Sequence, residues 1–282
     1  MSEPIARQVA IVGAGVMGSG IAALVLGHGI PVVLVDLDDT TLSAARFRIE
    51  QQLRHAQLMG ALPAGTAPGE LTTSVSLADV ANATAVIEAI VELPAEKAKV
   101  LAEVSAAVRP GTPLISNTSG IPIAELARSV DRPEELLGTH FMNPSYLIKM
   151  VEVSRGPQTG DAAVASVVEL LSALNRKAVI VRDAPGFVTS RLLHPMINAA
   201  ARIVGEGTAT VEAVDELMEG CLGHPTGPLR TADLIGLDNL ADSLQVLYER
   251  TGDPSCKPAD LLLEKVRQGD LGRKSGRGFY AY

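Results

Sequence analysis

The chain has 282 residues, 47% hydrophobic and 20% charged, which is the composition of a globular protein rather than a disordered one. Its 24 Lys and Arg against 32 Asp and Glu give a formal net charge of −8, and only 3% of the residues are aromatic. We therefore expect neither a basic phosphate-binding surface nor a stacking platform of rings, and no nucleic-acid partner.

Other features narrow the class of protein further. Two cysteines, Cys221 and Cys256, are too few for a disulfide framework or a zinc site, and no His, Asp and Glu cluster predicts a metal. The first residues lack the basic segment and apolar core of a secretory signal. The apolar stretch 21–35 is interrupted by glycine and proline. We expect a cytoplasmic protein that does not associate with membranes.

Strands and helices alternate over the first two thirds of the chain. Gln8–Gly13 and Pro31–Asp36 are short apolar runs typical of buried parallel strands, and a helix is expected between them. Residues 40–62 predict a helix, a turn and a further helix, and 63–74 predict a loop. Further strands are expected at Thr84–Ala89, Pro113–Ser116, Leu136–Phe141, Ile148–Val153 and Ala178–Val181, and further helices at 95–108 and 161–174.

After residues 183–186 only helical periodicity is found. One apolar stripe runs from Leu192 to Ile203 and another from Val211 to Cys221. We predict an α/β fold, with a doubly wound dinucleotide-binding (Rossmann) domain over residues 1–184 and a smaller all-α C-terminal domain over residues 185–282.

A glycine motif follows the first predicted strand. Residues 13–18 read G-A-G-V-M-G, a G-x-G-x-x-G that opens a predicted helix, and Asp36 ends the next strand. Glycines here allow a tight turn and close approach to a pyrophosphate, which the helix N-terminus attracts without a basic patch. Asp36 is expected to accept hydrogen bonds from ribose hydroxyls. Because Asp38 and Asp39 follow it and no arginine does, the sequence favours NAD over NADP.

A histidine and a glutamate are the main candidates for acid–base chemistry. His140 ends one predicted strand, and Glu152 lies on the next. A chain reversal at Asn143-Pro144 would bring Glu152 beside His140, where it could fix the imidazole tautomer of a general base. The alternative is that both side chains are simply solvated at strand ends. The other histidines, His28, His55, His194 and His224, are expected to be surface or satisfied core residues.

Around these residues the sequence resembles the short-chain L-3-hydroxyacyl-CoA dehydrogenase family, and is most similar to its bacterial 3-hydroxybutyryl-CoA dehydrogenases. The resemblance covers nearly the whole chain, in order. It rests on VAIVGAGVMGSGIA, VIEAIVE, SNTSGIPI, GTHFMNP with KMVEV, APGFVTSRLL, GHPTGPLRTADLIGLD and GRKSGRGFY.

The resemblance implies an oxidoreductase of fatty acid metabolism that oxidises a 3-hydroxyacyl thioester to the 3-oxoacyl thioester with NAD. In that family His140 would be the general base, Glu152 its orienting partner and Ser119 a hydrogen-bond donor to the substrate's 3-oxygen. Asn143 would position the nicotinamide, and the helical domain would form a homodimer. The positions implied to contact the cofactor are Gly13, Gly15, Val16, Met17, Gly18, Asp36, Glu92, Lys97, Asn143 and Lys274.

Two departures from the family pattern concern the substrate. Ser190 stands where the family usually has Asn near the catalytic end of the site. The positions that commonly hold a CoA-binding Ser and Lys fall at Gln52 and Met59, with Arg46, Arg48 and Arg54 nearby and a polar Ser145-Tyr146 pair further along. An alternative to CoA is therefore an acyl carrier protein thioester, such as glyceryl-carrier protein in polyketide extender-unit synthesis.

Two other functions are compatible with the fold. One is a non-catalytic NAD-binding protein of the kind found among lens crystallins, against which the presence of His140, Glu152, Ser119 and Asn143 counts. The other is a 6-phosphogluconate-type dehydrogenase with a catalytic lysine, for which Lys149 or Lys177 would have to serve although neither lies in a matching motif.

Overall fold

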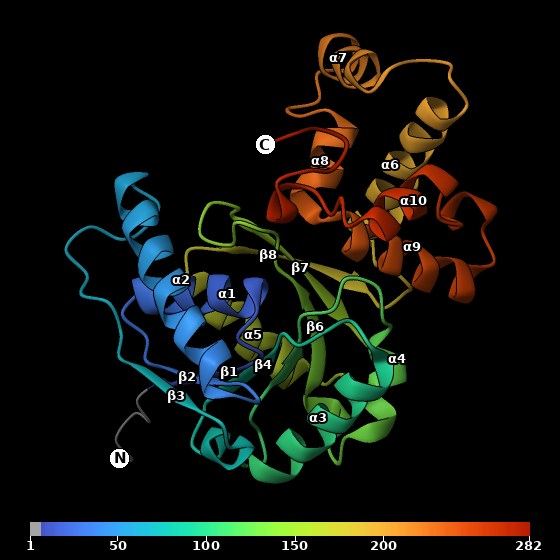
Figure 1. The fold of residues 1–282 in the computed structure, drawn as a ribbon. Helices are drawn as coiled ribbons and strands as arrows, with labels where there is room; N and C mark the ends of the chain where they lie inside the picture. The colour runs from blue at the N-terminus through green and yellow to red at the C-terminus, as the bar shows by residue number, and fades with distance from the viewer. Residues whose placement is uncertain (1–6) are drawn as a thin grey trace. The chain divides into compact units, whose positions relative to one another are not determined.

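The computed structural model describes residues 7–282, which form two compact units that divide after Ala184. The first unit is an eight-stranded sheet in the order β3-β2-β1-β4-β5-β6-β7-β8 (Figure 1). Its first six positions have the strand order of a dinucleotide-binding domain. The strands are β1 Val9–Val12, β2 Val32–Val35, β3 Leu71–Ser74, β4 Ala85–Glu88, β5 Leu114–Ser116, β6 Leu136–His140, β7 Met150–Arg155 and β8 Lys177–Arg182.

The direction of the strands decides where the loops gather. Neighbouring strands from β3 to β6 are parallel, the β6–β7 pair is antiparallel, and β7–β8 is parallel again. The carboxyl ends of β1, β2, β4, β5 and β6 therefore share one edge of the sheet. The order reverses between β1 and β4, which is the point where ligands bind in open α/β sheets.

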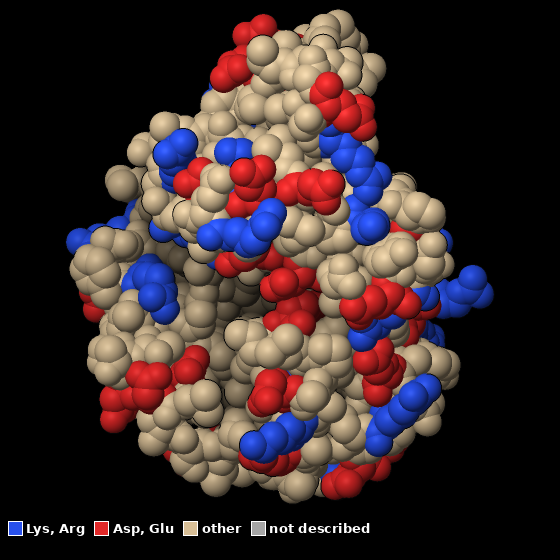
Figure 2. Space-filling view, turned by 45° about the vertical axis from the view of Figure 1, so that its right-hand side comes forward, with Lys and Arg blue, Asp and Glu red and all other residues tan. Residues whose placement is uncertain are grey.

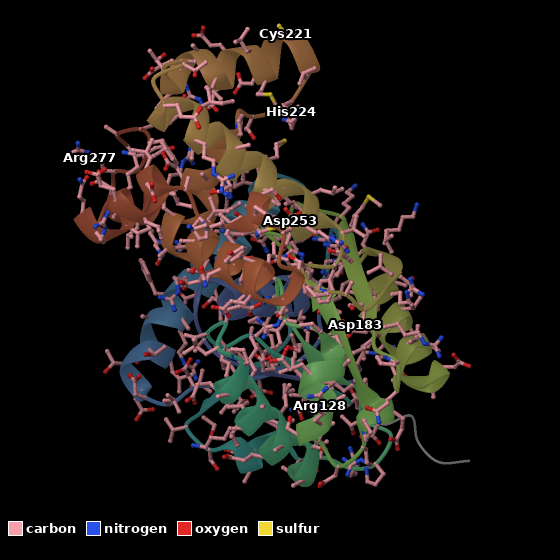
Figure 3. The ribbon with its side chains drawn as sticks, turned by 90° about the vertical axis from the view of Figure 1, so that its right-hand side faces the viewer. Arg128, Asp183, Cys221, His224, Asp253 and Arg277 are labelled. Atoms are coloured by element: carbon pink, nitrogen blue, oxygen red, sulfur yellow. The ribbon has the colours of Figure 1, made fainter. Side chains whose placement is uncertain are left out.

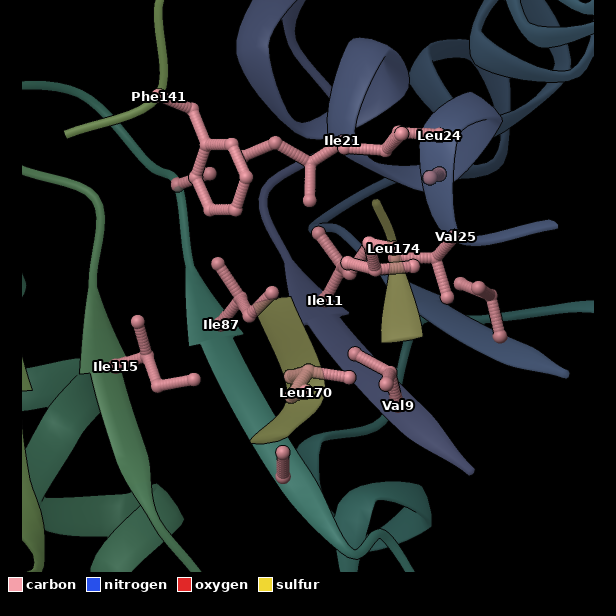
Figure 4. Packing of buried hydrophobic residues seen from close by; sticks show 14 of the residues in the cluster. Val9, Ile11, Ile21, Leu24, Val25, Ile87, Ile115, Phe141, Leu170 and Leu174 are labelled. Carbon is pink, nitrogen blue, oxygen red and sulfur yellow. The ribbon is translucent and has the colours of Figure 1, made fainter. Parts of the chain in front are cut away.

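Helices connect these strands and cover the sheet. All four residues of β1 are buried, which agrees with a strand covered on both faces. Val9 and Ile11 face a core that includes Ile21 and Leu24 of α1 and Leu170 of α5 (Figure 4). The helices of this unit are α1 Val16–Gly27, α2 Asp39–Leu58, α3 Pro94–Ala107, α4 Ile123–Leu126 and α5 Asp161–Ala173.

The structure corrects three details of the sequence prediction. Residues 71–74 are not loop but the strand β3, which only β2 borders, so that its half-buried residues carry no strong apolar pattern. The helix–turn–helix expected over 40–62 is one continuous helix, α2, which ends before the turn at Gly60. The strand expected from Ile148 begins at Met150.

The second unit is helical, as the sequence predicted. Its core gathers apolar residues of α6, α8, α9 and α10, among them Ile197, Leu229, Leu240 and Leu262. The helices are α6 Thr189–Gly205, α7 Val211–Leu222, α8 Pro228–Ile235, α9 Leu237–Thr251 and α10 Asp260–Gln268.

Two buried aspartates hold the C-terminal residues against this unit. Asp233, 1% exposed, accepts hydrogen bonds from the backbone N–H groups of Phe279 and Tyr280, both at 2.9 Å. The Tyr280 hydroxyl donates to Asp215, and burial followed by this contact raises the pKa of Tyr280. The chain end is therefore an ordered part of the second unit.

Side chains of both charges lie on one face of the molecule. On the face that Figure 2 shows, basic and acidic side chains are interspersed, in keeping with 24 Lys and Arg against 32 Asp and Glu. None of the helices between residues 7 and 282 has the length and apolar character that crossing a bilayer requires.

Candidate active site

The glycine motif forms the turn between β1 and α1, at the point where the sheet order reverses. Gly13 has φ +103°, and a Cβ there would lie 2.6 Å from the Ala89 carbonyl oxygen; a Cβ at Gly18 would lie 1.7 Å from the Gly13 oxygen. Packing of the chain itself thus requires these two glycines. A Cβ at Gly15 would meet nothing within 4 Å, so packing does not explain this third glycine. Open space at Gly15 fits the close approach of a pyrophosphate.

Asp36 follows β2 and touches the same turn. Its Oδ2 accepts from the Ala14 N–H at 2.6 Å and its Oδ1 from the Leu37 N–H at 2.7 Å. Each carboxylate oxygen has a further lone pair, so the group still has capacity to accept ribose hydroxyls. Asp38 instead caps α2: it accepts from the Thr41 N–H and hydroxyl, and these bonds lower the pKa of Asp38.

Glu92 organises the turn that follows β5. Its Oε1 accepts from the Thr118 hydroxyl at 2.5 Å and from the N–H groups of Ser119 and Gly120 at 2.7 and 3.1 Å. One carboxylate from the loop after β4 therefore fixes the backbone beside Ser119. The family resemblance implies that Glu92 contacts the cofactor, but no sequence signal indicated its hydrogen bonds to this turn, which lies 26 to 28 residues further along the chain.

Lys97 of α3 contacts Glu92, and the Lys97 side chain is fully buried. Its Nζ donates to Glu88 at 2.7 Å and lies 3.4 Å from Glu92, and the Glu88 side chain is also fully buried. Glu88 additionally accepts from the Ser116 hydroxyl at 2.6 Å and the Ile90 N–H at 2.9 Å. The Lys97 side chain therefore has no exposed surface, and its amine contacts the turn residue Glu92.

His140 and Glu152 occupy directly opposite positions of the antiparallel β6–β7 pair. His140 Nδ1 lies 3.4 Å from Glu152 Oε2, and the two residues are 7% and 8% exposed. The expected juxtaposition is thus confirmed, because the chain reverses within the loop that contains Asn143. A buried carboxylate beside an imidazole fixes its tautomer and stabilises its protonated form.

The residues that hold His140 in place come from the core. Phe141 is 3% exposed, and Figure 4 shows its ring beside Ile21 of α1. The Phe141 N–H donates to Asn117 Oδ1 at 3.1 Å, which links the end of β6 to the end of β5. Asn117 precedes the Ser119 turn, so the His140 strand and this turn are fixed to each other. The sequence offered no signal for Asn117 beyond its place in SNTSG.

The loop after Asn143 is held by two long-range contacts. Tyr146 donates or accepts a hydrogen bond with His55 Nδ1 at 2.8 Å, and burial raises the pKa of Tyr146. The buried Arg176 donates to the carbonyl oxygens of Ser145 and Tyr146 at 3.2 and 2.8 Å. The sequence reasoning missed Arg176, because a lone arginine before a strand has no distinguishing pattern.

Two of the remaining histidines make hydrogen bonds within their own units. His28 Nδ1 bonds to the Leu24 carbonyl at 2.8 Å, and burial lowers the pKa of His28. His194, in the second unit, lies 2.8 Å from the Ser243 hydroxyl.

Asp183 directly follows β8 (Figure 3). Its two carboxylate oxygens accept from the N–H groups of Ile123 and Ala124, both at 2.8 Å. Asp183 thereby caps α4, which follows the Ser119 turn.

Two of the expected site residues belong to the second unit. Ser190 on α6 is 1% exposed, and its hydroxyl has no hydrogen-bond partner among the residues that the structure describes. Lys274 forms an ion pair with Asp238 at 2.5 Å. The following expected site residues all belong to the first unit: Gly13, Gly15, Val16, Met17, Gly18, Asp36, Glu92, Ser119, Asn143, His140 and Glu152.

Comparison with known proteins gives the family. Residues 8–184 match the 3-hydroxyacyl-CoA dehydrogenase NAD binding domain, and residues 186–282 match the 3-hydroxyacyl-CoA dehydrogenase C-terminal domain. A probable 3-hydroxybutyryl-CoA dehydrogenase of Bacillus subtilis is 40% identical, over 98% of this chain and 97% of that protein. A 3-hydroxybutyryl-CoA dehydrogenase of Mycobacterium tuberculosis is 41% identical over 100% of both chains.

A solved structure agrees with these matches. The (S)-3-hydroxybutyryl-CoA dehydrogenase of Ralstonia eutropha has a TM-score of 0.85 and 38% identity, covering 98% of this chain and 99% of its own. The chain belongs to the 3-hydroxyacyl-CoA dehydrogenase family and is an NAD-dependent oxidoreductase of that type.

The buried Glu88–Lys97 pair yields a stability prediction. Lys97→Met leaves Glu88 buried without a cation, and we expect a loss of about 3 to 5 kcal/mol in the free energy of unfolding, measured with urea. The double variant Glu88→Gln with Lys97→Met removes both charges and should recover at least half of that loss. Lys99→Met, an exposed position on the same helix, is the control and should change stability by less than about 0.5 kcal/mol. Equal losses in the single and double variants would contradict the ion-pair explanation.

Proposed function

We propose that this chain oxidises a short 3-hydroxyacyl-CoA thioester, 3-hydroxybutyryl-CoA, to the 3-oxoacyl thioester with NAD as hydride acceptor. The observation that carries the proposal is the buried His140–Glu152 pair, held at the sheet edge where the glycine turn and the Ser119 turn also lie. The names of relatives about 40% identical over their full length support the choice of substrate.

His140 acts as the general base in the proposed mechanism. Glu152 lies on the Nδ1 side of the ring and holds the proton there, so Nε2 receives the proton of the substrate's 3-hydroxyl as hydride leaves C3. Glu152 then stabilises the imidazolium that results. Bound NAD supplies the acceptor for the hydride, and the residues of the chain bind and orient the two reactants.

The other proposed roles belong to the turns on the same edge. Ser119, whose backbone Glu92 holds, donates to the 3-oxygen, and the exposed Asn143, three residues after His140, positions the nicotinamide. Gly15, Val16 and Met17 begin α1 and offer its N-terminal N–H groups to the pyrophosphate. Ser190 and Lys274 of the second unit are the proposed substrate and cofactor contacts from that unit.

The general-base assignment is tested by His140→Gln. We expect kcat to fall by at least about 100-fold, because a positioned base typically contributes 10²- to 10⁴-fold, while the dissociation constant for NADH, measured by fluorescence, changes less than about twofold. His224→Gln, a histidine outside the candidate site, is the control and should retain full kcat. Turnover that survives in His140→Gln would mean that another group, such as Lys149 or Lys177, is the base.

The carrier of the acyl group needs its own test, because all three arginines considered for CoA have partners within the chain. Arg46 donates to Thr73 and Arg48 to the Ala14 carbonyl, each at 2.7 Å, and Arg54 donates more weakly to the Glu50 carbonyl at 3.4 Å.

We expect kcat/KM for 3-hydroxybutyryl-CoA to lie in the ordinary enzymatic range, about 10⁴ M⁻¹s⁻¹ or higher, and to exceed that for a carrier-protein-bound 3-hydroxyacyl group such as glyceryl-carrier protein. The measurement is initial-rate kinetics with both thioesters under the same conditions. A higher kcat/KM for the carrier-protein thioester would mean that an acyl carrier protein, and not CoA, carries the acyl group of the physiological substrate.

Homodimer formation is the proposed role of exposed apolar residues on α7. Leu217 and Leu222 are 58% and 67% exposed, and Cys221 lies near the end of the same helix (Figure 3). Exposed large apolar side chains gathered on one helix favour a surface that another chain covers.

Charge at these two positions should break the dimer. Leu217→Asp combined with Leu222→Asp is expected to give a monomer in light scattering, because burying an unpaired carboxylate in an apolar interface is strongly unfavourable. Leu58→Asp, at an 85% exposed leucine of α2, is the control and should leave the mass unchanged. A wild-type chain that is itself monomeric at micromolar concentration would exclude this dimer.

A further inference from the structure

Arg48 of α2 contacts the glycine turn, which joins β1 and α1. Arg48 donates from Nη2 to the Ala14 carbonyl oxygen at 2.7 Å, and its Nε lies 3.4 Å from the Ser19 hydroxyl oxygen. The Ser19 hydroxyl donates to the same Ala14 oxygen at 3.1 Å. One carbonyl group of the turn therefore accepts two side-chain hydrogen bonds, one of them from a cation.

This carbonyl shares a peptide group with the N–H of Gly15. The bond is trans, and in a planar trans peptide the C=O and N–H point in opposite directions. By holding the Ala14 oxygen toward α2, Arg48 and Ser19 direct the Gly15 N–H to the other side of the turn. The space around Gly15 is open, since an added Cβ would meet nothing within 4 Å.

The preceding peptide group is held as well. The Ala14 N–H donates to Asp36 Oδ2 at 2.6 Å. Two consecutive peptide groups of the turn are thus fixed from two sides, by the carboxylate that ends β2 and by the guanidinium of α2. The turn has little freedom to rotate the Gly15 N–H away from its present direction.

Charge gives Arg48 a second effect. Asp36 is bonded to the turn, and Asp38 and Asp39 follow it in the chain. A pyrophosphate that approaches this turn meets an unfavourable field, which a guanidinium bonded to the turn offsets. A charged donor on a carbonyl oxygen also polarises its peptide group, so the N–H of that group becomes a stronger donor.

We propose that Arg48 is a positioning residue of the cofactor site, which orients and polarises the Ala14–Gly15 peptide group so that the Gly15 N–H binds the pyrophosphate of NAD. The inference rests on the placement of the pyrophosphate at the glycine turn under the proposed function. It revises the view, taken from the sequence, that the glycine turn and helix end act without a basic residue.

The test compares ligands with and without the pyrophosphate. Dissociation constants for ADP-ribose are measured by calorimetry, and inhibition constants for adenosine by its displacement of fluorescent NADH. Arg48→Gln retains a hydrogen-bond donor for the carbonyl but removes the charge. Arg48→Lys retains the charge and donates from a single ammonium group instead of a planar guanidinium. Arg46→Gln is the matched control, because Arg46 is an exposed arginine two residues earlier on α2 and its loss changes the net charge equally.

We expect Arg48→Gln to weaken ADP-ribose binding about tenfold, the effect of losing a charge-assisted contribution, and Arg48→Lys to weaken it less than about threefold. Arg46→Gln should leave it within about twofold, and adenosine binding should be unchanged in all three variants.

Three results would overturn the proposal: wild-type ADP-ribose affinity in Arg48→Gln, equal losses in Arg48→Gln and Arg46→Gln, or an adenosine loss as large as the ADP-ribose loss. Thermal unfolding of each variant establishes that it is folded at the temperature of the titration. No thioester is present in these titrations, so an incorrect substrate assignment would leave their outcome unaffected.

Discussion

Parallel pairing from β1 to β6 is the constraint on which the candidate active site depends. Strands that run in one direction end at one edge, whatever their separation in the sequence. The glycine turn follows β1, Asp36 follows β2, Glu92 lies in the loop after β4, and the Ser119 turn follows β5. The next strand ends on His140, and the antiparallel β7 then returns Glu152 to the same edge.

Buried charge in this acidic chain is balanced locally. Lys97 is shared between two glutamates, Glu88 and Glu92. Asp183 is stabilised by the N-terminal N–H groups of α4, and Asp215 accepts from the N–H groups of Leu229 and Arg230 at the start of α8. A formal net charge of −8 therefore says little about the field at any one turn, which neighbouring donors determine.

The family fixes the type of reaction, while the identity of the substrate depends on a few side chains. Glu92, a candidate site residue of the first unit, accepts three hydrogen bonds from the Ser119 turn. By contrast, Arg54 on α2 is exposed, and Ser190 of the second unit has an unpaired hydroxyl among the described residues. Relatives that share one fold but differ in substrate are expected to differ at such exposed or unpaired side chains.

Local patterns in the sequence determined most of the strands and helices, the glycine turn, and the juxtaposition of His140 with Glu152. Each depends on residues close together in the chain: an apolar run, a glycine spacing, or two strands joined by a short loop. The strand β3 was missed for the converse reason, since an edge strand with one neighbour needs little apolar surface.

Only the tertiary structure decided how distant residues act together. Glu92 and Ser119, Lys97 and Glu88, and Arg48 and Ala14 are joined by folding of the sheet and its helices. No local pattern in the sequence indicated the contacts of Lys97 with Glu88 or of Arg48 with Ala14, because the sequence around a charged residue does not show which distant group it will contact. The fold determines the partner, since a charge that is buried away from water is stable only with a complementary group within hydrogen-bond distance.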